Sequence, residues 1–191
     1  MINLMNRNYL NIEDYQNKYN NSEIVAKIDI EGTNINKLVT QTNDNDHYLT
    51  YSLDNKKNDK GNIFIDYRNN ILNSKKIIIY GHNSKKYDAD FKELENYMDY
   101  NYYINHKFIT LKTKYYDKEY EIFSVALYNN NYSYLQINFD NQNWYDHLLY
   151  LQNNSIYKID VELKNNDSII VLQTCSQKYK DTFLVISAKL V

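Results

Sequence analysis

The stretch VLQTCS at residues 171–176 ends an apolar run near the C-terminus and places Cys175 where that run meets polar sequence. Cys175 is the only cysteine in 191 residues, so no internal disulfide can form. A second apolar run ends upstream in YGHN, at residues 80–83, and delivers His82. Two strands that end side by side would bring these residues together across their long separation in sequence. A thiol beside an imidazole predicts nucleophilic acyl transfer.

Strand patterns dominate the chain outward from these two runs. The alternation of Ile24, Ala26, Ile28 and Ile30 with other residues predicts a half-buried strand. Further stretches with strand character lie at residues 62–67, 76–80, 108–113, 119–128, 132–139, 168–174 and 182–190. About eight strands with few long helices favour a closed barrel or a sandwich.

Helical spacing interrupts the strands at three places. A short helix is predicted around Ile12, with Asn11 as its N-cap, and longer helical patterns cover residues 88–98 and 143–151. The chain has no proline and only three glycines, so its turns are expected to rely on Asn and Asp. The glycines are therefore expected where a side chain does not fit.

Composition narrows the class of protein. No repeat or linker divides the chain, which predicts an N-terminal helical segment at residues 1–23 and a single β domain at residues 24–191. The net charge of −2, with acids and bases interspersed, argues against a nucleic-acid or anionic-membrane binder. No apolar run reaches the ~18 residues of a membrane span, and no signal peptide is visible. Composition leaves two readings open, a cytoplasmic protein or the extramembrane part of an anchored chain.

Metal and cofactor chemistry is not expected. The four histidines are dispersed and there is no second cysteine to complete a ligand pair. Phosphate-loop and dinucleotide motifs are also missing from the sequence. The acidic residues Asp88, Asp90, Glu93 and Glu95 are expected to form the solvated face of a helix.

The motifs around the three glycines resemble those of the sortase family, and of class B sortases in particular. They are IEGTNI at residues 30–35, GNIFIDYRN at 61–69, YGHN at 80–83 and LQTC at 172–175, in the order of the family. This resemblance implies an eight-stranded β-barrel with N-terminal helices and an extra helix before the cysteine strand. It also implies a cysteine transpeptidase on the extracytoplasmic face of a Gram-positive cell membrane, held there by an anchor that this chain does not contain.

The same resemblance implies roles for individual residues. Cys175 would attack a C-terminal sorting signal and hold the protein as a thioester, with His82 as general acid and base. An amine from a cell-wall precursor or a pilin-like subunit would release the protein. Thr174 would stand beside the thiol, and the groove for the signal peptide would be lined by Asn45, Leu49, Tyr134 and Leu135.

One residue of the family pattern is missing. Sortases carry an arginine at the start of the last strand, where it holds the substrate and stabilises the oxyanion, and Phe183 occupies that place here. Losing one oxyanion donor typically costs roughly a hundred- to a thousand-fold in rate. Lys178 or Lys180 could supply a replacement cation, although each could equally be a solvated loop lysine. Arg68 lies in the DYR motif, and we expect it to pair with Asp66.

Three functions follow from these residues. The first is a class B-like sortase, and the second is a sortase-fold protein that binds signal peptides without turning them over. The third is a thiol hydrolase on the same scaffold. The observation that separates the first two is whether a cation or Phe183 occupies the space between His82 and Cys175.

Overall fold

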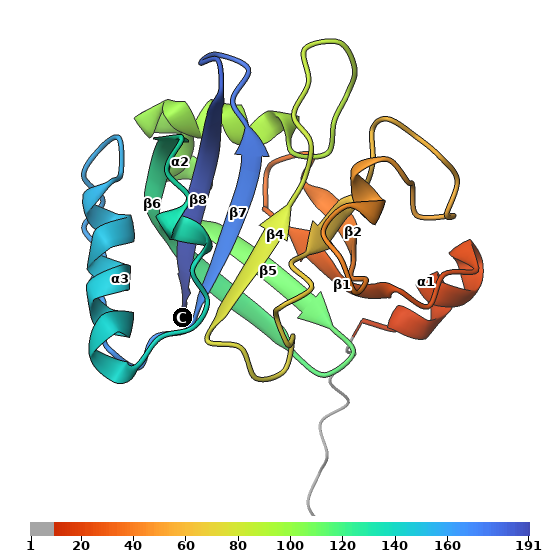
Figure 1. Cartoon of the computed structure of the whole chain (residues 1–191), viewed down its shortest axis with the longest axis horizontal. Helices are drawn as coiled ribbons and strands as arrows, with labels where there is room; N and C mark the ends of the chain where they lie inside the picture. Colours follow the sequence, from red (N-terminus) through yellow and green to blue (C-terminus); the bar gives the residue numbers. More distant parts are fainter. Residues whose placement is uncertain (1–9) are drawn as a thin grey trace, which may run out of the picture.

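The alternating pattern that begins at Ile24 forms the first strand of a barrel. In the computed structural model, which describes residues 10–191, every second residue of this strand is buried. The eight strands are β1 (Ile24–Asp29), β2 (Asn36–Thr40), β3 (Ile63–Ile65), β4 (Lys76–Tyr80), β5 (Phe108–Thr113), β6 (Asp117–Asn129), β7 (Ile169–Cys175) and β8 (Thr182–Leu190). They close in the order β1-β2-β3-β4-β7-β8-β6-β5, and the eight-stranded barrel is confirmed. Figure 1 shows β4, β7, β8 and β6 side by side on the near face of the barrel.

The pairing of β4 with β7 decides where the site lies. These two strands run parallel, with Ile79 opposite Leu172 and Tyr80 opposite Gln173. Their middles are apolar and buried, which is typical of parallel strands covered on both faces. Because parallel strands end at the same edge of a sheet, the residues that follow Tyr80 and the last residues of β7 meet there.

Helices cover the outside of the barrel. They are α1 (Ile12–Tyr19), α2 (Tyr100–Asn105) and α3 (Asn141–Asn153), with 3-10 helices η1 (His47–Leu49), η2 (Lys92–Met98) and η3 (Ser133–Leu135). In Figure 1, α1 and α3 lie on opposite sides of the barrel. Within residues 10–191 no helix combines the length and the apolar character needed to cross a membrane.

The predicted helices are found, with differences at their ends. The helix expected at 143–151 is α3, which buries Trp144, Leu148 and Leu151. Asn11 occupies the N-cap position of α1, but its side chain makes no capping hydrogen bond. Residues 1–9 of the expected N-terminal segment lie outside the described residues.

Two strand predictions differ from the structure. A strand is predicted at residues 132–139, but they contain η3 and an irregular stretch, so that prediction is wrong. The strand β2 was not predicted from the sequence, because Leu38–Thr40 are buried one after another and its five residues show no alternation. The number of strands is nevertheless as expected, since the missed strand replaces the false one.

Candidate active site

The ladder between β4 and β7 continues past the strand ends into the site. The amide of Gly81 donates to Gln173 O at 3.2 Å, and Thr174 Oγ1 donates to Gly81 O at 2.7 Å. These bonds hold the segment of His82 against the segment of Cys175. Both residues line one groove of about 320 Å³.

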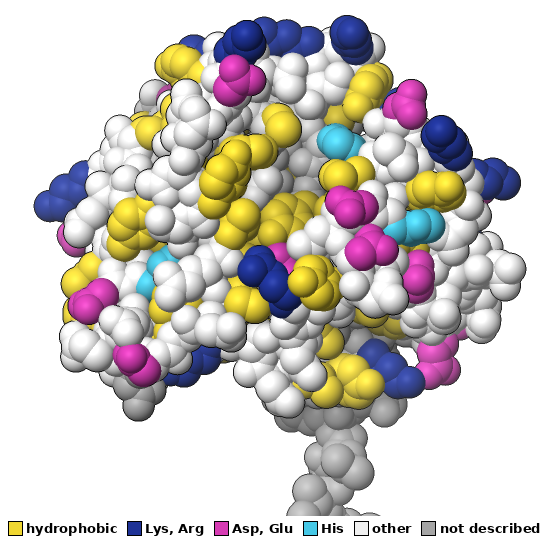
Figure 2. Space-filling view, in the orientation of Figure 1, with side chains coloured by type: hydrophobic (Ala, Val, Ile, Leu, Met, Phe, Trp, Pro, Cys, Tyr) yellow, Lys and Arg dark blue, Asp and Glu magenta, His cyan; other side chains and the backbone are white. Residues whose placement is uncertain are grey.

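The groove contains every residue that the sequence placed in it. Thr174, Asn45, Leu49, Tyr134 and Leu135 all line it, as does Phe183, which the sequence placed at the position of the missing arginine. The lining residues that sequence reasoning did not assign are Phe64, Tyr80, Gly81, Tyr132 and Gln173. Apolar side chains gather in the hollow of this face in Figure 2.

Two of the unassigned lining residues had a usable sequence signal. Tyr80 and Gln173 are the neighbours of Gly81 and Thr174 and form the last register pair between the same two strands. Phe64 is brought in by its register pairing with Tyr80, and their rings lie 5.2 Å apart. Tyr132 belongs to the irregular segment, and no sequence pattern indicated it.

The environment of Cys175 disfavours the thiolate. The residue reaches solvent, yet the protein packed around it raises the pKa of the thiol by partial burial. Because only the thiolate is a strong nucleophile, the thiol needs a base to take its proton.

The structure fixes His82 through its Nε2 atom. This nitrogen lies 2.8 Å from Leu49 O. A carbonyl oxygen only accepts, so the contact assigns the proton of the neutral ring to Nε2 and leaves Nδ1 as the basic nitrogen. A proton taken from a nucleophile would therefore enter at Nδ1.

Gly61 makes room for this arrangement. The chain has only three glycines, which predicted that each of them stands where a side chain does not fit. Its φ is +60°, and a Cβ there would collide with the carbonyls of Tyr48 and Leu49 and lie 3.0 Å from His82 Cδ2. Any side chain at position 61 would displace the carbonyl that holds the imidazole. At Gly81, a Cβ would lie 2.6 Å from the ring of Phe91, so this close packing also needs glycine.

The prediction of a solvated acidic face is wrong. Glu95, in η2, accepts hydrogen bonds from Asn83 Nδ2, from Ser176 Oγ at 2.9 Å and from the amides of Gln177 and Lys178 at 3.0 Å. We call these five residues the Glu95 cluster. It joins the residue after His82 to the loop after Cys175, and Asn83 Nδ2 also donates to Cys175 O at 3.1 Å.

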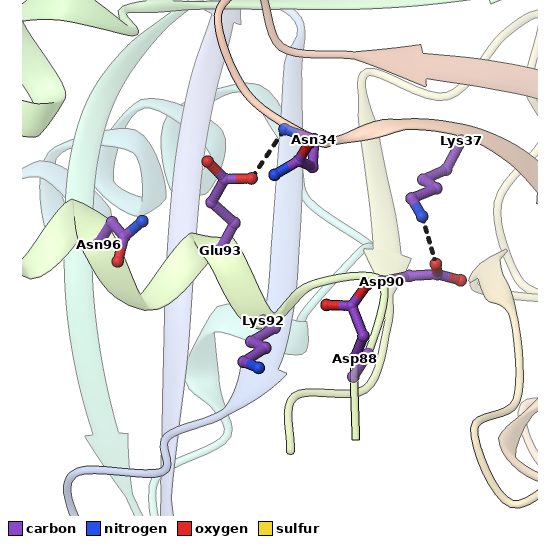
Figure 3. Close-up of a pocket in the computed structure, with 8 residues that line it drawn as sticks. Asn34, Lys37, Asp88, Asp90, Lys92, Glu93 and Asn96 are labelled. Carbon is purple, nitrogen blue, oxygen red and sulfur yellow. Dashed lines mark hydrogen bonds and ion pairs between the residues drawn. The ribbon is translucent and has the colours of Figure 1, made fainter. Parts of the chain in front are cut away.

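Two of the other three acidic side chains of this region are also paired, while Asp88 is exposed as expected. Figure 3 shows Asp90 beside Lys37, with 2.9 Å between the charged atoms, and Glu93 accepting from the amide of Asn34 at 2.7 Å. These contacts attach η2 to the turn between β1 and β2, and the segment before η2 to β2 itself. They explain why the acidic pattern could not be taken as solvent-facing from spacing alone.

Phe183 occupies the place of the missing arginine. It pairs in register with Cys175 and lines the groove, where its ring centroid lies 5.9 Å from that of Tyr132. No lysine or arginine is present among the described residues that line the groove.

The two candidate replacement cations point elsewhere. Lys178 Nζ lies over the ring of Tyr179 at 5.7 Å, and Lys180 Nζ lies 3.9 Å from Asp181 on the exposed loop. Neither lysine lines the groove. A substitute cation would have to come from a rearrangement of this loop.

The predicted pairing of Arg68 with Asp66 is confirmed. Arg68 donates from Nε at 2.8 Å and from Nη2 at 2.7 Å to the two oxygens of the buried carboxylate. Tyr80 donates its hydroxyl to the same carboxylate at 2.6 Å. These contacts give the DYR motif a structural role.

Within residues 10–191 no group of three His, Cys, Asp or Glu side chains is placed to hold a metal ion.

An eight-stranded barrel with a cysteine and a histidine at the ends of adjacent parallel strands defines a class of protein, the sortase-type cysteine transpeptidases. The Sortase domain matches residues 28–191, and the chain belongs to the sortase family.

Among its relatives the chain is similar to class B members. It is 33% identical to sortase B of Listeria monocytogenes and 31% identical to sortase B of Staphylococcus aureus. Each match extends over 175 residues, which are 90% of this chain and 71% of the relative.

Solved structures show the same fold. The C232S mutant of Clostridium perfringens sortase B superposes with a TM-score of 0.88 at 30% identity, covering 94% of this chain and 85% of that one. The Staphylococcus aureus sortase B–substrate complex superposes with a TM-score of 0.86 at 29% identity, covering 94% and 84%. A sortase B complexed with triglycine gives a TM-score of 0.86 at 30% identity, covering the same shares.

Proposed function

We propose that this protein is a class B-like sortase that cleaves a C-terminal sorting signal and transfers the carrier protein to an amine acceptor. The observation that carries the proposal is the meeting of His82 and Cys175 in one apolar groove at the ends of β4 and β7. The function assigned to the family agrees with this geometry.

The reaction follows from the protonation states of the two residues. Nδ1 of His82 takes the proton of the Cys175 thiol, and the thiolate attacks the scissile carbonyl of the sorting signal. When the tetrahedral intermediate collapses, the C–N bond breaks and His82 returns the proton to the leaving amine. An acceptor amine then attacks the thioester and gives its proton to His82, and the S–C bond breaks as His82 passes this proton to the departing sulfur, which regenerates the thiol and the neutral imidazole.

The groove suits an extended peptide with apolar side chains. Leu49, Leu135 and the surrounding aromatic rings offer apolar contact, and Thr174 lies beside the nucleophile. Asn45 Oδ1 accepts from the amide of Tyr67 at 3.0 Å, which leaves Asn45 Nδ2 as a donor for a peptide carbonyl.

The partners and location follow from the same proposal. The substrate is the sorting signal of a surface protein, and the acceptor is an amine of a cell-wall precursor or a pilin-like subunit. Structures of sortase B with a substrate and with triglycine support both classes of ligand. The protein would act on the extracytoplasmic side of a Gram-positive membrane.

A second function is favoured by one observation. With Phe183 facing the groove and no cation among the described lining residues, the site lacks the donor that stabilises an oxyanion. A protein that binds sorting signals in this groove without turning them over is therefore the alternative.

One experiment separates these functions. The protein is incubated with a randomised pentapeptide library flanked by a fluorophore and a quencher, with and without triglycine, and the products are identified by mass spectrometry. A sortase gives a Cys175 thioester and a triglycine-linked product, and Cys175→Ala gives neither. Peptide retention without a thioester supports the binding protein, and free acid in the presence of triglycine supports a hydrolase. Cleavage that persists in Cys175→Ala overturns the proposal.

A further inference from the structure

One wall of the peptide groove has no strand to support it. Tyr134 and Leu135 line the groove, and they belong to residues 132–139, which we call the wall segment. Its only regular element is the single turn η3, in which the amides of Leu135 and Gln136 donate to Tyr132 O and Ser133 O. One 3-10 turn is too short to hold its position alone.

A buried lysine supports this wall. Lys76, the first residue of β4, is 2% exposed, and its Nζ reaches across to the wall segment. It donates to Tyr134 O and, at 2.9 Å, to Gln136 O. The third contact of Nζ is His147 Nε2 in α3, also at 2.9 Å.

The carbonyl of Leu135, between those of Tyr134 and Gln136, also accepts a hydrogen bond. Arg68 Nη2 donates to Leu135 O at 3.3 Å while it pairs with Asp66. Three successive carbonyls, those of residues 134–136, therefore each accept from a cationic side chain. Backbone groups that a neighbouring strand would satisfy in a sheet are satisfied here by side chains.

The lysine keeps its partners in either protonation state. Burial lowers the pKa of Lys76 to about 7, and burial together with Lys76 lowers the pKa of His147 to about 3. A charged Lys76 donates three hydrogen bonds, to the two carbonyls and to unprotonated Nε2. A neutral Lys76 donates two and accepts one from Nε2–H of the other imidazole tautomer. The contacts to the wall persist across neutral pH.

Ion pairing gives no reason for a lysine at this position. No carboxylate within residues 10–191 forms an ion pair with it, and desolvating an ammonium group is costly. An apolar residue of similar length would avoid that cost. What the lysine adds is a fixed position for the residues that face the groove.

We propose that Lys76 is a positioning residue of the peptide groove, which holds the wall segment through the carbonyls of Tyr134 and Gln136 and so sets the shape of the surface that selects the sorting signal. This rests on the proposed function, because it assumes that the groove binds a peptide.

The test compares Lys76→Met with Lys75→Met, its exposed neighbour in sequence. Amide exchange is followed residue by residue by NMR, and affinity is measured by calorimetry in a Cys175→Ala background. The ligand is the library pentapeptide that the wild-type protein retains best. Lys76→Met should speed exchange of Leu135 and Gln136 at least tenfold and weaken the peptide Kd at least tenfold. Lys75→Met should change neither.

Two further readings distinguish positioning from stability. Lys76→Met removes a buried ammonium group but also leaves the carbonyls of Tyr134 and Gln136 without that donor, so its melting temperature should fall by no more than a few degrees. With Cys175 present, alkylation by iodoacetamide should proceed at the wild-type rate, because Lys76 does not line the part of the groove that holds the thiol.

Several outcomes would overturn the inference. Unchanged exchange at Leu135 and Gln136 would show that Lys76 does not hold the wall, and faster exchange with an unchanged Kd would remove its role in the groove. If Lys76→Met does not fold, Lys76→Gln supplies the same comparison with a side chain that still donates two hydrogen bonds. If the wild-type protein neither cleaves nor retains any peptide, the proposed function fails, whereas the exchange rates still decide whether Lys76 holds the wall.

Discussion

The two sides of the groove are built by different means. On one side, β4 and β7 present His82 and Cys175 through a parallel backbone ladder that continues in the bonds of Gly81 and Thr174. On the other side, the wall segment is held by side chains: Lys76 and Arg68 bind its carbonyls, and the buried Tyr134 donates its hydroxyl to Gln173 at 3.0 Å. A backbone ladder tolerates changes of side chain, whereas a wall held by side chains changes shape when one of them is replaced. Under the proposed function, the chemistry would lie on the rigid side and peptide selection on the adjustable side.

The largest effect is expected on the ladder side. Replacing the base in His82→Gln should lower kcat/KM by about 10²–10⁴-fold, the usual contribution of general acid–base catalysis. The measurement is cleavage of the selected peptide, and His106→Gln is the matched control because His106 does not line the groove. Equal activity of the two variants would remove His82 from the mechanism.

The next effect is a gain in catalytic rate, from a substitution at Phe183, where the two sides of the groove meet. Phe183→Arg restores a donor opposite Cys175 and should raise kcat by roughly 10²–10³-fold if the remaining site is competent. Phe183→Leu, which removes the ring without adding a cation, separates this from relief of crowding. A rate in Phe183→Arg no higher than in Phe183→Leu would show that the missing cation is not what limits the enzyme.

A smaller loss of activity is expected when the hydrogen bonds of the Glu95 cluster are weakened. In Glu95→Gln one acceptor oxygen becomes an amide that faces backbone donors, and hydrogen bonds to a charged group are each worth about 1.5–3 kcal/mol. We expect alkylation of Cys175 and turnover to slow by about tenfold, which corresponds to about 1.4 kcal/mol. Glu93→Gln, on the same helix but bonded away from the loop, is the control. The cluster has no positioning role if both variants react alike.

The smallest effect concerns pH and belongs to the wall. The folded-state pKa of Lys76 is lowered to about 7 from 10.5, mainly by burial, with Arg68 lowering it further and Asp66 opposing. Between these values the unfolded chain binds more protons, so the lysine's contribution to stability is complete above pH 10.5 and is lost as pH falls toward 7. The free energy of unfolding of wild type relative to Lys76→Met should therefore rise across this window, by at most about 1.4 kcal/mol per pH unit. Denaturant titrations at pH 7, 8 and 9 measure this slope, and a difference that falls with pH would contradict the assigned shift.

The parts of the site that could be predicted from sequence are those on regular strands. The apolar runs near the ends of β4 and β7 show where these strands stop, at Tyr80 and Cys175, and the predicted pair lies at these two ends. The family motifs then indicated the barrel and the residues of the groove. Alternation failed at residues 132–139, because Tyr134 is buried in a turn and its neighbours are held by side chains.

Local periodicity and motif order are properties of neighbouring residues. The amino-acid sequence alone was therefore sufficient to predict the barrel, the placement of Cys175 and His82 in one groove, and Phe183 at the position of an arginine. The positions of Glu95 and Lys76 were decided by tertiary structure. Glu95 bonds to a loop 81–83 positions away, and Lys76 bonds to carbonyls 58 and 60 positions away. A charged residue has the same pattern in a sequence whether it faces water or holds a distant backbone, because its partner is defined only when the barrel closes.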